Sequence, residues 1–400
     1  MMGEILNGYD MSLRANLWKI YIYKFLSEFY LLAPILIPYY KASGLNSTQI
    51  FTVQAAYALS VLVFEIPSGY LADVLGRKQT MIIGAVLFPV GIGIYAFTGL
   101  FWTFLLAELV LAIANSMRSG CDSALLYDSL LAMGQESQYK KFEGKSFFFA
   151  RIGSSLASVM GGLLALFFLR LPLIANIVTA SAMLPFALAL TEPERTKLRV
   201  DRPLRDILSI ARFSLSHQSL RPLIFAAALI MSTGIIGIWA YFLYYEALDV
   251  NIGYFGVLFA LFQLSSALGS KTSHRIEARW GFKSSLQMLL LIAPVFLLLG
   301  LISSIWMIPL IMLNGYIWGF SFPLLMNSMN RFISSDIRAT VLSVANMAGS
   351  FSYVLLSPAF GRIVDVFSLS TAFILIAGYF LIYAAFSFRG VSRNPPTETN

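Results

Sequence analysis

The residues best placed to do chemistry are charged side chains that interrupt long apolar stretches of the sequence. Lys24 and Glu28 lie four residues apart in one stretch, and Arg118 and Asp122 have the same spacing in another. Residues four apart share one face of a helix, so each pair could form an ion pair there. The full set is Lys24, Glu28, Glu108, Arg118, Asp122 and Arg151.

A charge at the centre of a spanning helix costs about 2.5–3.5 kcal/mol on insertion scales, so such groups are kept where they are paired or line a wet cavity. A carboxylate poised between burial and a neighbouring cation can exchange a proton as substrate or water enters. We expect Glu28 to be the main proton site and Asp122 the second. Two mutually neutralised structural pairs are the alternative. Glu108 could instead be a solvated or helix-packing residue.

Composition places these charges in a membrane protein. The chain has 400 residues, of which 58% are hydrophobic and 12% charged, whereas soluble domains average about 25% charged residues. Several apolar runs exceed the roughly 20 residues that cross a bilayer. The single cysteine, Cys121, excludes an internal disulfide, and two histidines leave few metal ligands. We therefore expect a polytopic α-helical protein with no metal site and no cofactor, and without a nucleotide-binding motif that would supply ATP.

Hydropathy predicts twelve spans in two groups of six. The predicted spans are 17–41, 48–72, 80–97, 101–130, 146–169, 173–190, 222–248, 252–271, 284–302, 305–332, 337–364 and 368–388. They form an N-terminal bundle (1–191) and a C-terminal bundle with a short tail (222–400). The polar linker between them, 192–221, has helical periodicity over 204–215, which is typical of an amphipathic helix at the membrane surface.

Basic residues support this count of spans. If both termini are cytoplasmic, most of the 28 Lys and Arg residues fall on the cytoplasmic side, and only Lys41, Arg170 and Arg362 fall on the other. That is the bias expected for inserted helices. The net charge of +8 is therefore explained by topology, and we expect no nucleic-acid partner.

The loop between the second and third predicted spans carries a recognisable motif. Its residues are Gly69, Leu71, Ala72, Asp73, Gly76, Arg77 and Lys78. The pattern G-x-L-A-D-x-x-G-R-K resembles the helix 2–3 loop of bacterial members of the major facilitator superfamily. The segment aligns on 274–283 in the second half, with Gly281 and Lys283 matching Gly76 and Lys78. Parallel repeats of this kind are a transporter architecture, for which this superfamily is a standard example.

The resemblance implies two pseudo-symmetric six-helix bundles and a conformational gate. In the family the aspartate at Asp73 latches the two halves, and its expected counterpart here is the start of the eleventh span, near 336–338. Arg77 is expected to pair with an acid at the end of the fourth span, where Asp128 stands. Glu65, close to the same surface, is assigned to this gate.

Two further segments can be compared with the family. The fifth span carries Gly153, Ala157, Ser158, Gly161 and Gly162, which is similar to the antiporter motif except that Ala157 and Ser158 replace Gly-Pro. Close packing of membrane helices explains small residues at this spacing equally well. In the fourth span, Ser116 stands where drug antiporters carry an arginine, and Arg118 is rotated away from that position.

The second half contributes aromatic and amide groups instead of charges. The candidate substrate residues are Trp239, Tyr241, Gln263, Asn314, Trp318 and Asn346. Lining a cavity, they would suit an amphipathic or aromatic organic solute. Tyr244 and Tyr245 are expected to be interfacial anchors instead.

The sequence thus predicts a secondary transporter that moves a small organic solute by alternating access, driven by a proton gradient and exporting its substrate. The alternatives are uptake or facilitated diffusion of a polar metabolite or organic anion, held by Lys24, Arg118 and Arg151. A receptor or lipid scramblase on the same fold is more remote. We expect a monomer without enzymatic activity in a bacterial inner membrane, with the lipid bilayer and a small-molecule substrate as its partners.

Overall fold

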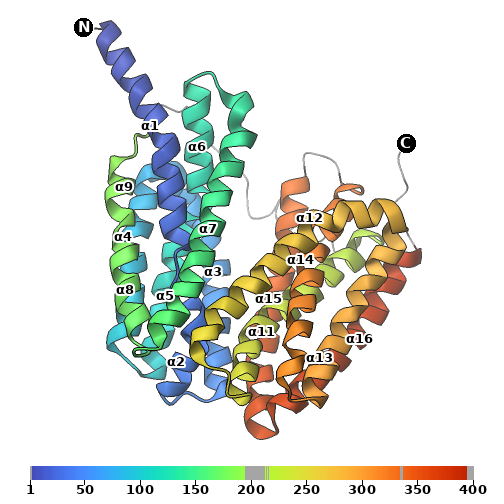
Figure 1. Ribbon diagram of the computed structural model, residues 1–400. Coiled ribbons are helices and arrows are strands. Elements are labelled where there is room, and N and C mark those ends of the chain that lie inside the picture. Colours follow the sequence, from blue (N-terminus) through green and yellow to red (C-terminus); the bar gives the residue numbers. More distant parts are fainter. Residues whose placement is uncertain (1, 194–211, 213, 215, 334–336, 394–400) are drawn as a thin grey trace. The chain divides into compact units, whose positions relative to one another are not determined.

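The structure is a computed structural model that describes residues 2–193, 212, 214, 216–333 and 337–393 (Figure 1). All regular elements within this described part of the chain are helices. In the first half they are α1 (Met2–Glu28), α2 (Leu36–Ala42), α3 (Ser47–Leu75), α4 (Arg77–Phe97), α5 (Phe101–Arg118), α6 (Cys121–Ala132), α7 (Tyr139–Ala165), α8 (Leu171–Ser181) and α9 (Met183–Ala189). In the second half they are α11 (Leu220–Ala247), α12 (Phe255–Met288), α13 (Ile292–Leu301), α14 (Ile308–Asn330), α15 (Arg338–Val366) and α16 (Leu369–Arg393).

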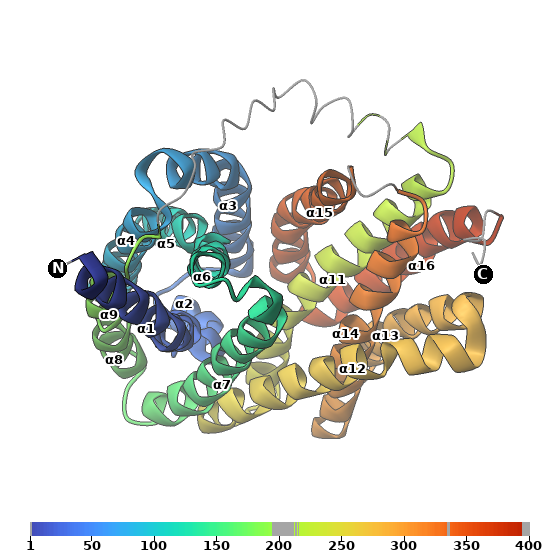
Figure 2. The same ribbon diagram turned by 90° about the horizontal axis from the view of Figure 1, so that it is seen from above.

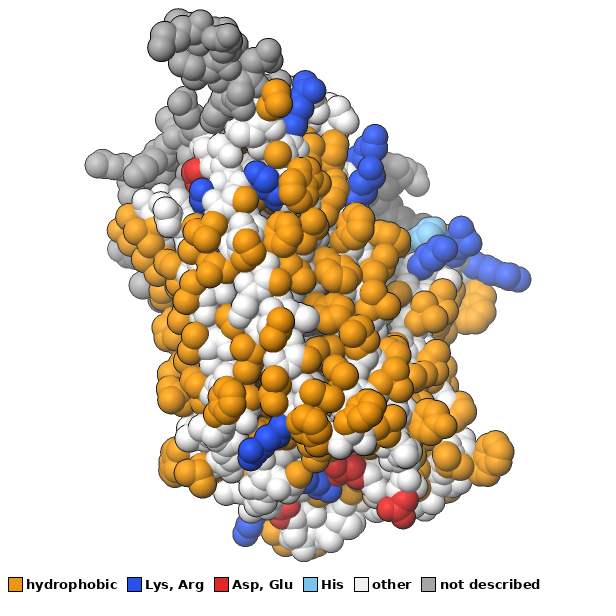
Figure 3. Space-filling model, turned by 60° about the vertical axis from the view of Figure 1, so that its left-hand side comes forward, with side chains coloured by type: hydrophobic (Ala, Val, Ile, Leu, Met, Phe, Trp, Pro, Cys, Tyr) orange, Lys and Arg blue, Asp and Glu red, His pale blue; other side chains and the backbone are white. Residues whose placement is uncertain are grey.

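Length and composition make these helices suited to a bilayer. Among the described residues, 11 helical segments are long and apolar enough to cross a membrane, and Leu369–Ile382 is a shorter apolar helix. On the face shown in Figure 3, hydrophobic side chains cover the middle, and charged side chains lie toward the two ends. This distribution is the one expected when the middle of the protein faces hydrocarbon.

The helices group into two compact units. The N-terminal unit comprises Met1–Leu45, Ala56–Arg199 and Asn251–Val257, and the C-terminal unit comprises Asn46–Ala55, Val200–Val250 and Leu258–Asn400. Compared with the predicted segments, the first turns of α3 fall in the C-terminal unit, and the start of α12 falls in the N-terminal unit. The predicted amphipathic helix at 204–215 lies almost entirely outside the described residues.

The first predicted span, 17–41, is broken in the structure. Helix α1 ends at Glu28, and the chain is non-helical before a 3-10 turn at Ala33–Ile35 and helix α2. The side chain of Asn176 accepts a hydrogen bond from Leu31 N at 3.1 Å and donates one to Phe29 O at 3.0 Å. Exposed backbone groups are very costly in hydrocarbon, so Asn176 on α8 makes this break possible.

The fourth predicted span, 101–130, is also broken. Helix α5 ends at Arg118, Gly120 adopts a left-handed conformation with φ 74°, and α6 begins at Cys121. Glycine tolerates this conformation because it has no Cβ. Both breaks lie in the N-terminal unit, and both adjoin charged residues predicted to be functional: Glu28 ends α1, and Asp122 lies in the first turn of α6.

Small residues hold α7 closely against α1, and the two helices lie side by side in Figures 1 and 2. A Cβ atom added at Gly153 would overlap the carbonyl oxygen of Phe25, and one at Gly161 would overlap that of Leu31. The motif in the fifth span therefore packs α7 against the broken segment of the first span. Helix α7 begins at Tyr139, earlier than the predicted start at residue 146.

The predicted repeat has a structural counterpart at two glycines. Gly76 has φ 110° and ψ 151°, and Gly281 has φ 78° and ψ 163°. This region of backbone space is essentially restricted to glycine. The two halves therefore use the same turn at the positions that the alignment pairs.

Candidate functional site

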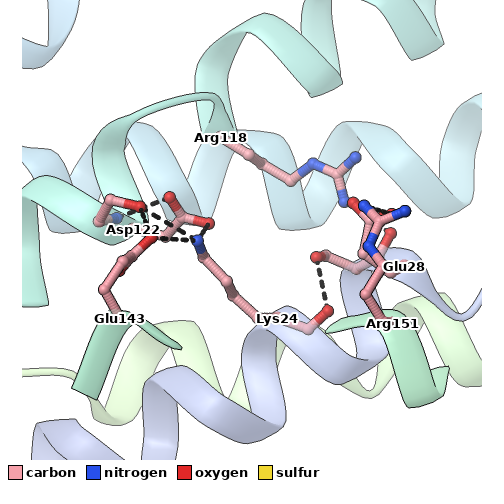
Figure 4. A network of polar contacts seen from close by, with 8 residues as sticks. Lys24, Glu28, Arg118, Asp122, Glu143 and Arg151 are labelled. Carbon is pink, nitrogen blue, oxygen red and sulfur yellow. Dashed lines mark hydrogen bonds and ion pairs between the residues drawn. The ribbon is translucent and has the colours of Figure 1, made fainter. Parts of the chain in front are cut away.

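Three helices of the N-terminal unit bring charged side chains together (Figure 4). Lys24 Nζ on α1 lies 3.3 Å from Asp122 Oδ2 on α6 and 3.3 Å from Glu143 Oε1 on α7. The hydroxyl of Ser123 donates to the same Glu143 oxygen at 2.6 Å. The side chains of Lys24 and Asp122 are 14% and 16% exposed. One ammonium group is thus held against two carboxylates.

A second ion pair joins α1 and α7. Arg151 NH2 lies 3.7 Å from Glu28 Oε2, and the two side chains are 50% and 42% exposed. The guanidinium of Arg151 also lies 4.9 Å from the ring centre of Phe147. Glu28 is therefore only partly covered by protein and has a cationic partner on another helix.

Arg118, the last residue of α5, is buried between helices. Its NH1 donates to the carbonyl of Ser27 and its NH2 to Asn115 Oδ1, both at 3.2 Å. Its guanidinium carbon lies 4.5 Å from the ring centre of Phe88. Only 8% of the residue is exposed, and its Nε has no hydrogen-bond partner.

The predicted ion pairs along single helices are wrong. Among the described residues, Lys24 pairs with Asp122 and Glu143, while Glu28 pairs with Arg151. Arg118 and Asp122 do not pair, because the break at Gly120 removes the helical register that the spacing assumes. The charged groups of the first and fourth spans still meet, through the contact between Lys24 and Asp122.

Sequence reasoning missed Glu143 because it placed this residue in a polar loop. The signal was present in the spacing. The buried positions of α7 include Ser146, Ala150, Gly153 and Ala157, and one further step of three residues toward the N-terminus reaches Glu143. Extending a helical stripe of small residues would have placed this carboxylate on the face that contacts α1.

Glu108 is buried in a cluster of tyrosines. It is 4% exposed, and its Oε1 accepts hydrogen bonds from Tyr40 at 3.0 Å and Tyr95 at 2.6 Å. The two tyrosine hydroxyls also contact each other. The alternative of a solvated side chain is therefore wrong, and Glu108 joins α2, α4 and α5 in the interior of the unit.

The loop before α4 is held by contacts within the same unit. Arg77 forms an ion pair with Asp128, as the resemblance implies. The carboxylate of Glu192 accepts hydrogen bonds from the backbone of Arg77 at 3.0 Å and Lys78 at 2.6 Å. Glu192 therefore caps the N-terminus of α4, a role that the sequence did not indicate. The proposed counterpart of Asp73 includes Asp336, which lies outside the described residues.

The C-terminal unit contains a cavity of about 450 Å³ between α11, α12, α14 and α15. Of the predicted substrate residues, Trp318 and Asn346 line it, together with Ser266, Ser270 and Ser321. Most of the remaining lining is apolar, and the described residues around it include no charged side chain. Such a site fits an uncharged, largely apolar group.

The other predicted substrate residues lie outside the cavity lining. Tyr241 and Asn314 are buried and hydrogen-bonded to each other, and the Tyr241 ring stacks on Phe296 with centres 6.2 Å apart. Trp239 and Gln263 are partly exposed. Tyr244 and Tyr245, predicted as interfacial anchors, are each 2% exposed, so that interpretation is wrong for both.

Comparison with known proteins identifies the family. The sequence profile of the Major Facilitator Superfamily matches residues 25–356. The chain belongs to this superfamily. It is 29% identical over 114 residues to the MFS-type transporter ppzB of Metarhizium rileyi, a match that spans 28% of this chain and 22% of that protein.

Solved structures share the fold across almost the whole chain. The nucleoside transporter NupG superposes with a TM-score of 0.80 at 18% identity, covering 94% of this chain and 98% of that one. A bacterial homologue of the human lysosomal transporter Spinster gives 0.70 at 16% identity, covering 96% and 97%. A POT family transporter in complex with a thioalcohol-conjugated peptide gives 0.71 at 13% identity, covering 94% and 96%. The protein is thus a multi-pass membrane transporter of the major facilitator type.

Proposed function

We propose that the protein is a proton-coupled exporter of a small organic solute that works by alternating access. The observation that carries this proposal is the position of Lys24 between Asp122 and Glu143. One positive charge against two carboxylates leaves a negative excess in a largely buried place. A proton on either carboxylate removes that excess, so the cluster is suited to binding and releasing one proton.

Proton binding at the cluster of Lys24, Asp122 and Glu143 would also affect the packing of the helices that carry these residues. Its members belong to α1, α6 and α7, and two of these helices begin or end at a break. A unit charge pair about 4 Å apart contributes about 4 kcal/mol at an effective dielectric constant of about 20. Protonation of Asp122 or Glu143 therefore weakens the attraction between α1 and its neighbour by an amount large enough to shift a conformational equilibrium.

A purely structural role explains this arrangement less well. A neutralised structural pair needs one carboxylate for one ammonium group, but Lys24 has two, and Glu143 Oε2 is buried without a hydrogen-bond partner. Ionisable residues inside membrane spans are costly and typically mark ion pathways. The small-residue motif of α7, which resembles that of antiporters and packs on the break in the first span, supports the direction of export.

The uncharged cavity of the C-terminal unit supports an organic solute with an apolar part. Trp318 offers an aromatic face, and Asn346 with three serines offers a few hydrogen bonds within an otherwise apolar lining. Ligand sites commonly combine these features.

The test uses the full chain in proteoliposomes that contain a trapped pH-sensitive dye. A panel of small organic compounds is added, and solute-evoked proton movement is followed in the wild type and in the double variant Asp122→Asn/Glu143→Gln. We expect movement in the wild type and a loss of about tenfold or more in the double variant. Glu136→Gln, which removes an exposed carboxylate before α7, serves as the matched control.

The direction is read from the same assay. Solute that moves opposite to protons supports export, and solute that moves with them supports uptake instead. Solute flux without any proton movement, or full coupling in the double variant, would contradict the proposed proton role.

A further inference from the structure

Arg118 carries a positive charge that the surrounding protein leaves unbalanced. Its hydrogen bonds go to two neutral oxygen atoms, the Ser27 carbonyl and the Asn115 amide, and its remaining contact is the ring face of Phe88. Among the described residues, no carboxylate lies within ion-pair distance of it. A guanidinium that is 8% exposed inside a membrane span is costly unless an anion joins it.

The position of Arg118 is built into the packing. A Cβ atom added at Gly84 of α4 would lie 2.6 Å from Arg118 Cγ, so glycine makes room for the arginine side chain. Its Nε is completely buried and lacks an acceptor. Arginine presents its N–H groups in a planar fork that matches the two oxygen atoms of a carboxylate.

The charges around Arg118 separate into a group with excess positive charge and a group with excess negative charge. Arg118 bonds to the carbonyl of Ser27, the residue before Glu28, and in Figure 4 its guanidinium lies on the same side of the network as Glu28 and Arg151. Two guanidinium groups and one carboxylate leave one positive charge in excess here. Lys24 with its two carboxylates leaves one negative charge in excess. The six charges balance as a set, but they are separated into a cationic and an anionic part.

We propose that the cationic part is a subsite for the carboxylate of the transported solute, formed by buried Arg118 and half-exposed Arg151. This inference rests on the proposed function and adds that the solute is an organic acid or a zwitterion. Arriving carboxylate displaces Glu28 from Arg151 and supplies the counter-ion that Arg118 lacks. The uncompensated charge is then the means by which an acid is distinguished from its uncharged analogue.

The test measures equilibrium binding without a proton gradient. Thermal unfolding of the purified full chain is followed with increasing acetate, benzoate or succinate, and with the matched amides acetamide, benzamide and succinamide. A ligand that binds only the folded protein raises its melting temperature saturably. We expect at least one acid to raise it while its amide does not.

Variants identify the residues that carry the effect. In Arg118→Gln and in Arg151→Gln we expect the half-saturating acid concentration to rise about tenfold or more. Arg362→Gln, which removes one exposed positive charge from the C-terminal unit, should leave it unchanged. If Arg118→Gln does not yield folded protein, Arg118→Lys replaces it, because lysine keeps the charge and loses the planar fork.

Several outcomes would overturn the inference. They are equal stabilisation by acid and amide, absence of stabilisation by every acid, and an unchanged acid preference in both the Arg118→Gln and the Arg151→Gln variants. Because no transport is measured, these outcomes leave proton-coupled export standing. Conversely, acid binding that depends on Arg118, without any solute-evoked proton movement, would refute the coupling and leave the subsite intact.

Discussion

The two halves of the chain share a backbone plan and differ in chemistry. Gly76 and Gly281 adopt the same glycine-only conformation at equivalent loops. The N-terminal unit, however, holds six charged side chains near helix breaks, whereas the described lining of the C-terminal cavity is uncharged. One fold can therefore bind protons and anionic groups in one half and apolar groups in the other.

The helix breaks occur next to the charged residues of the N-terminal unit. The first and fourth spans are interrupted after Glu28 and after Arg118. Their counterparts in the second half, α11 and α14, are continuous over Leu220–Ala247 and Ile308–Asn330. Non-helical backbone at membrane depth is tolerated where it is buried in protein or lines a wet cavity. The contrast indicates that the N-terminal unit contains the more polar interior, which ionisable residues require.

The largest effect is expected when Lys24, the cation between the two carboxylates of the N-terminal unit, is removed. Lys24→Met leaves Asp122 and Glu143 facing each other without a counter-charge. Breaking such a buried pair costs about 3–5 kcal/mol, so we expect a large fall in melting temperature and loss of proton coupling. Adding Asp122→Asn should recover part of the stability, whereas Lys140→Met, at an exposed position, should change little. A Lys24→Met protein with wild-type stability would show that the ion pairs of Lys24 with Asp122 and Glu143 do not contribute to the stability of the fold.

The second prediction concerns the packing that supports the break in the first span. Gly161→Ala places a methyl group against the carbonyl oxygen of Leu31, a backbone atom that cannot move aside easily. Overpacking of this kind costs up to about 3 kcal/mol. We expect a lower melting temperature together with slower transport, because α7 is pushed away from α1. Gly93→Ala on α4 is the matched control, since its new Cβ meets nothing within 4 Å.

These sites show which features sequence reasoning could reach. The glycine turns at Gly76 and Gly281 follow from local sequence pattern, and the ion pair of Arg77 with Asp128 follows from the family resemblance; the structure contains both turns and the ion pair. The break after Glu28 depends on Asn176, which lies far along the chain and satisfies the freed backbone groups. The periodicity of the sequence around Glu28 cannot predict a contact with a residue so far along the chain.

The candidate site was predictable in its members but less so in its contacts. Five of its six charged residues were identifiable because charges stand out in apolar sequence, whereas the sixth predicted residue, Glu108, lies in the tyrosine cluster instead. The pairing of Arg118 with Asp122 was mistaken because the four-residue rule assumes a continuous helix, and Gly120 interrupts it. Lys24 and Glu28 do share one helix, but each pairs with residues of other helices instead. Glu143 was missed for a related reason: its helix begins at Tyr139, inside a stretch that looks like a polar loop.

The third prediction compares the stability lost when the equivalent glycines of the two halves, Gly76 and Gly281, are each replaced by alanine. Gly281→Ala forces a side chain into a backbone region that only glycine adopts readily, which costs about 1–3 kcal/mol. Nothing lies within 4 Å of the new Cβ at Gly281, whereas at Gly76 it would meet the Glu192 carboxylate at 3.3 Å. We therefore expect Gly76→Ala to lower the melting temperature more than Gly281→Ala. Equal losses would show that Glu192 moves aside without cost, and a larger loss at Gly281 would contradict the prediction.

The last prediction compares two carboxylates that cap helices, one in each unit. Asp365 in the C-terminal unit accepts hydrogen bonds from the backbone of Ser47 at 2.9 Å and Thr48 at 2.7 Å, at the first turn of α3. Glu192 serves the start of α4 in the same way. Losing a cap costs about 1 kcal/mol, so Asp365→Ala and Glu192→Ala should each lower the melting temperature by a few degrees.

The two capping carboxylates differ in how exposed their surroundings are. Asp365 also accepts from the Thr48 hydroxyl at 2.6 Å and is exposed, whereas Glu192 binds a loop next to the partly buried ion pair of Arg77. Exposed groups regain hydrogen bonds from water, so Asp365→Ala should be the milder change. Asp365→Asn keeps an oxygen acceptor and should recover most of the loss, which thermal unfolding of the three variants side by side would measure. A larger loss at Asp365 than at Glu192 would mean that the first turn of α3 depends on this contact for more than capping.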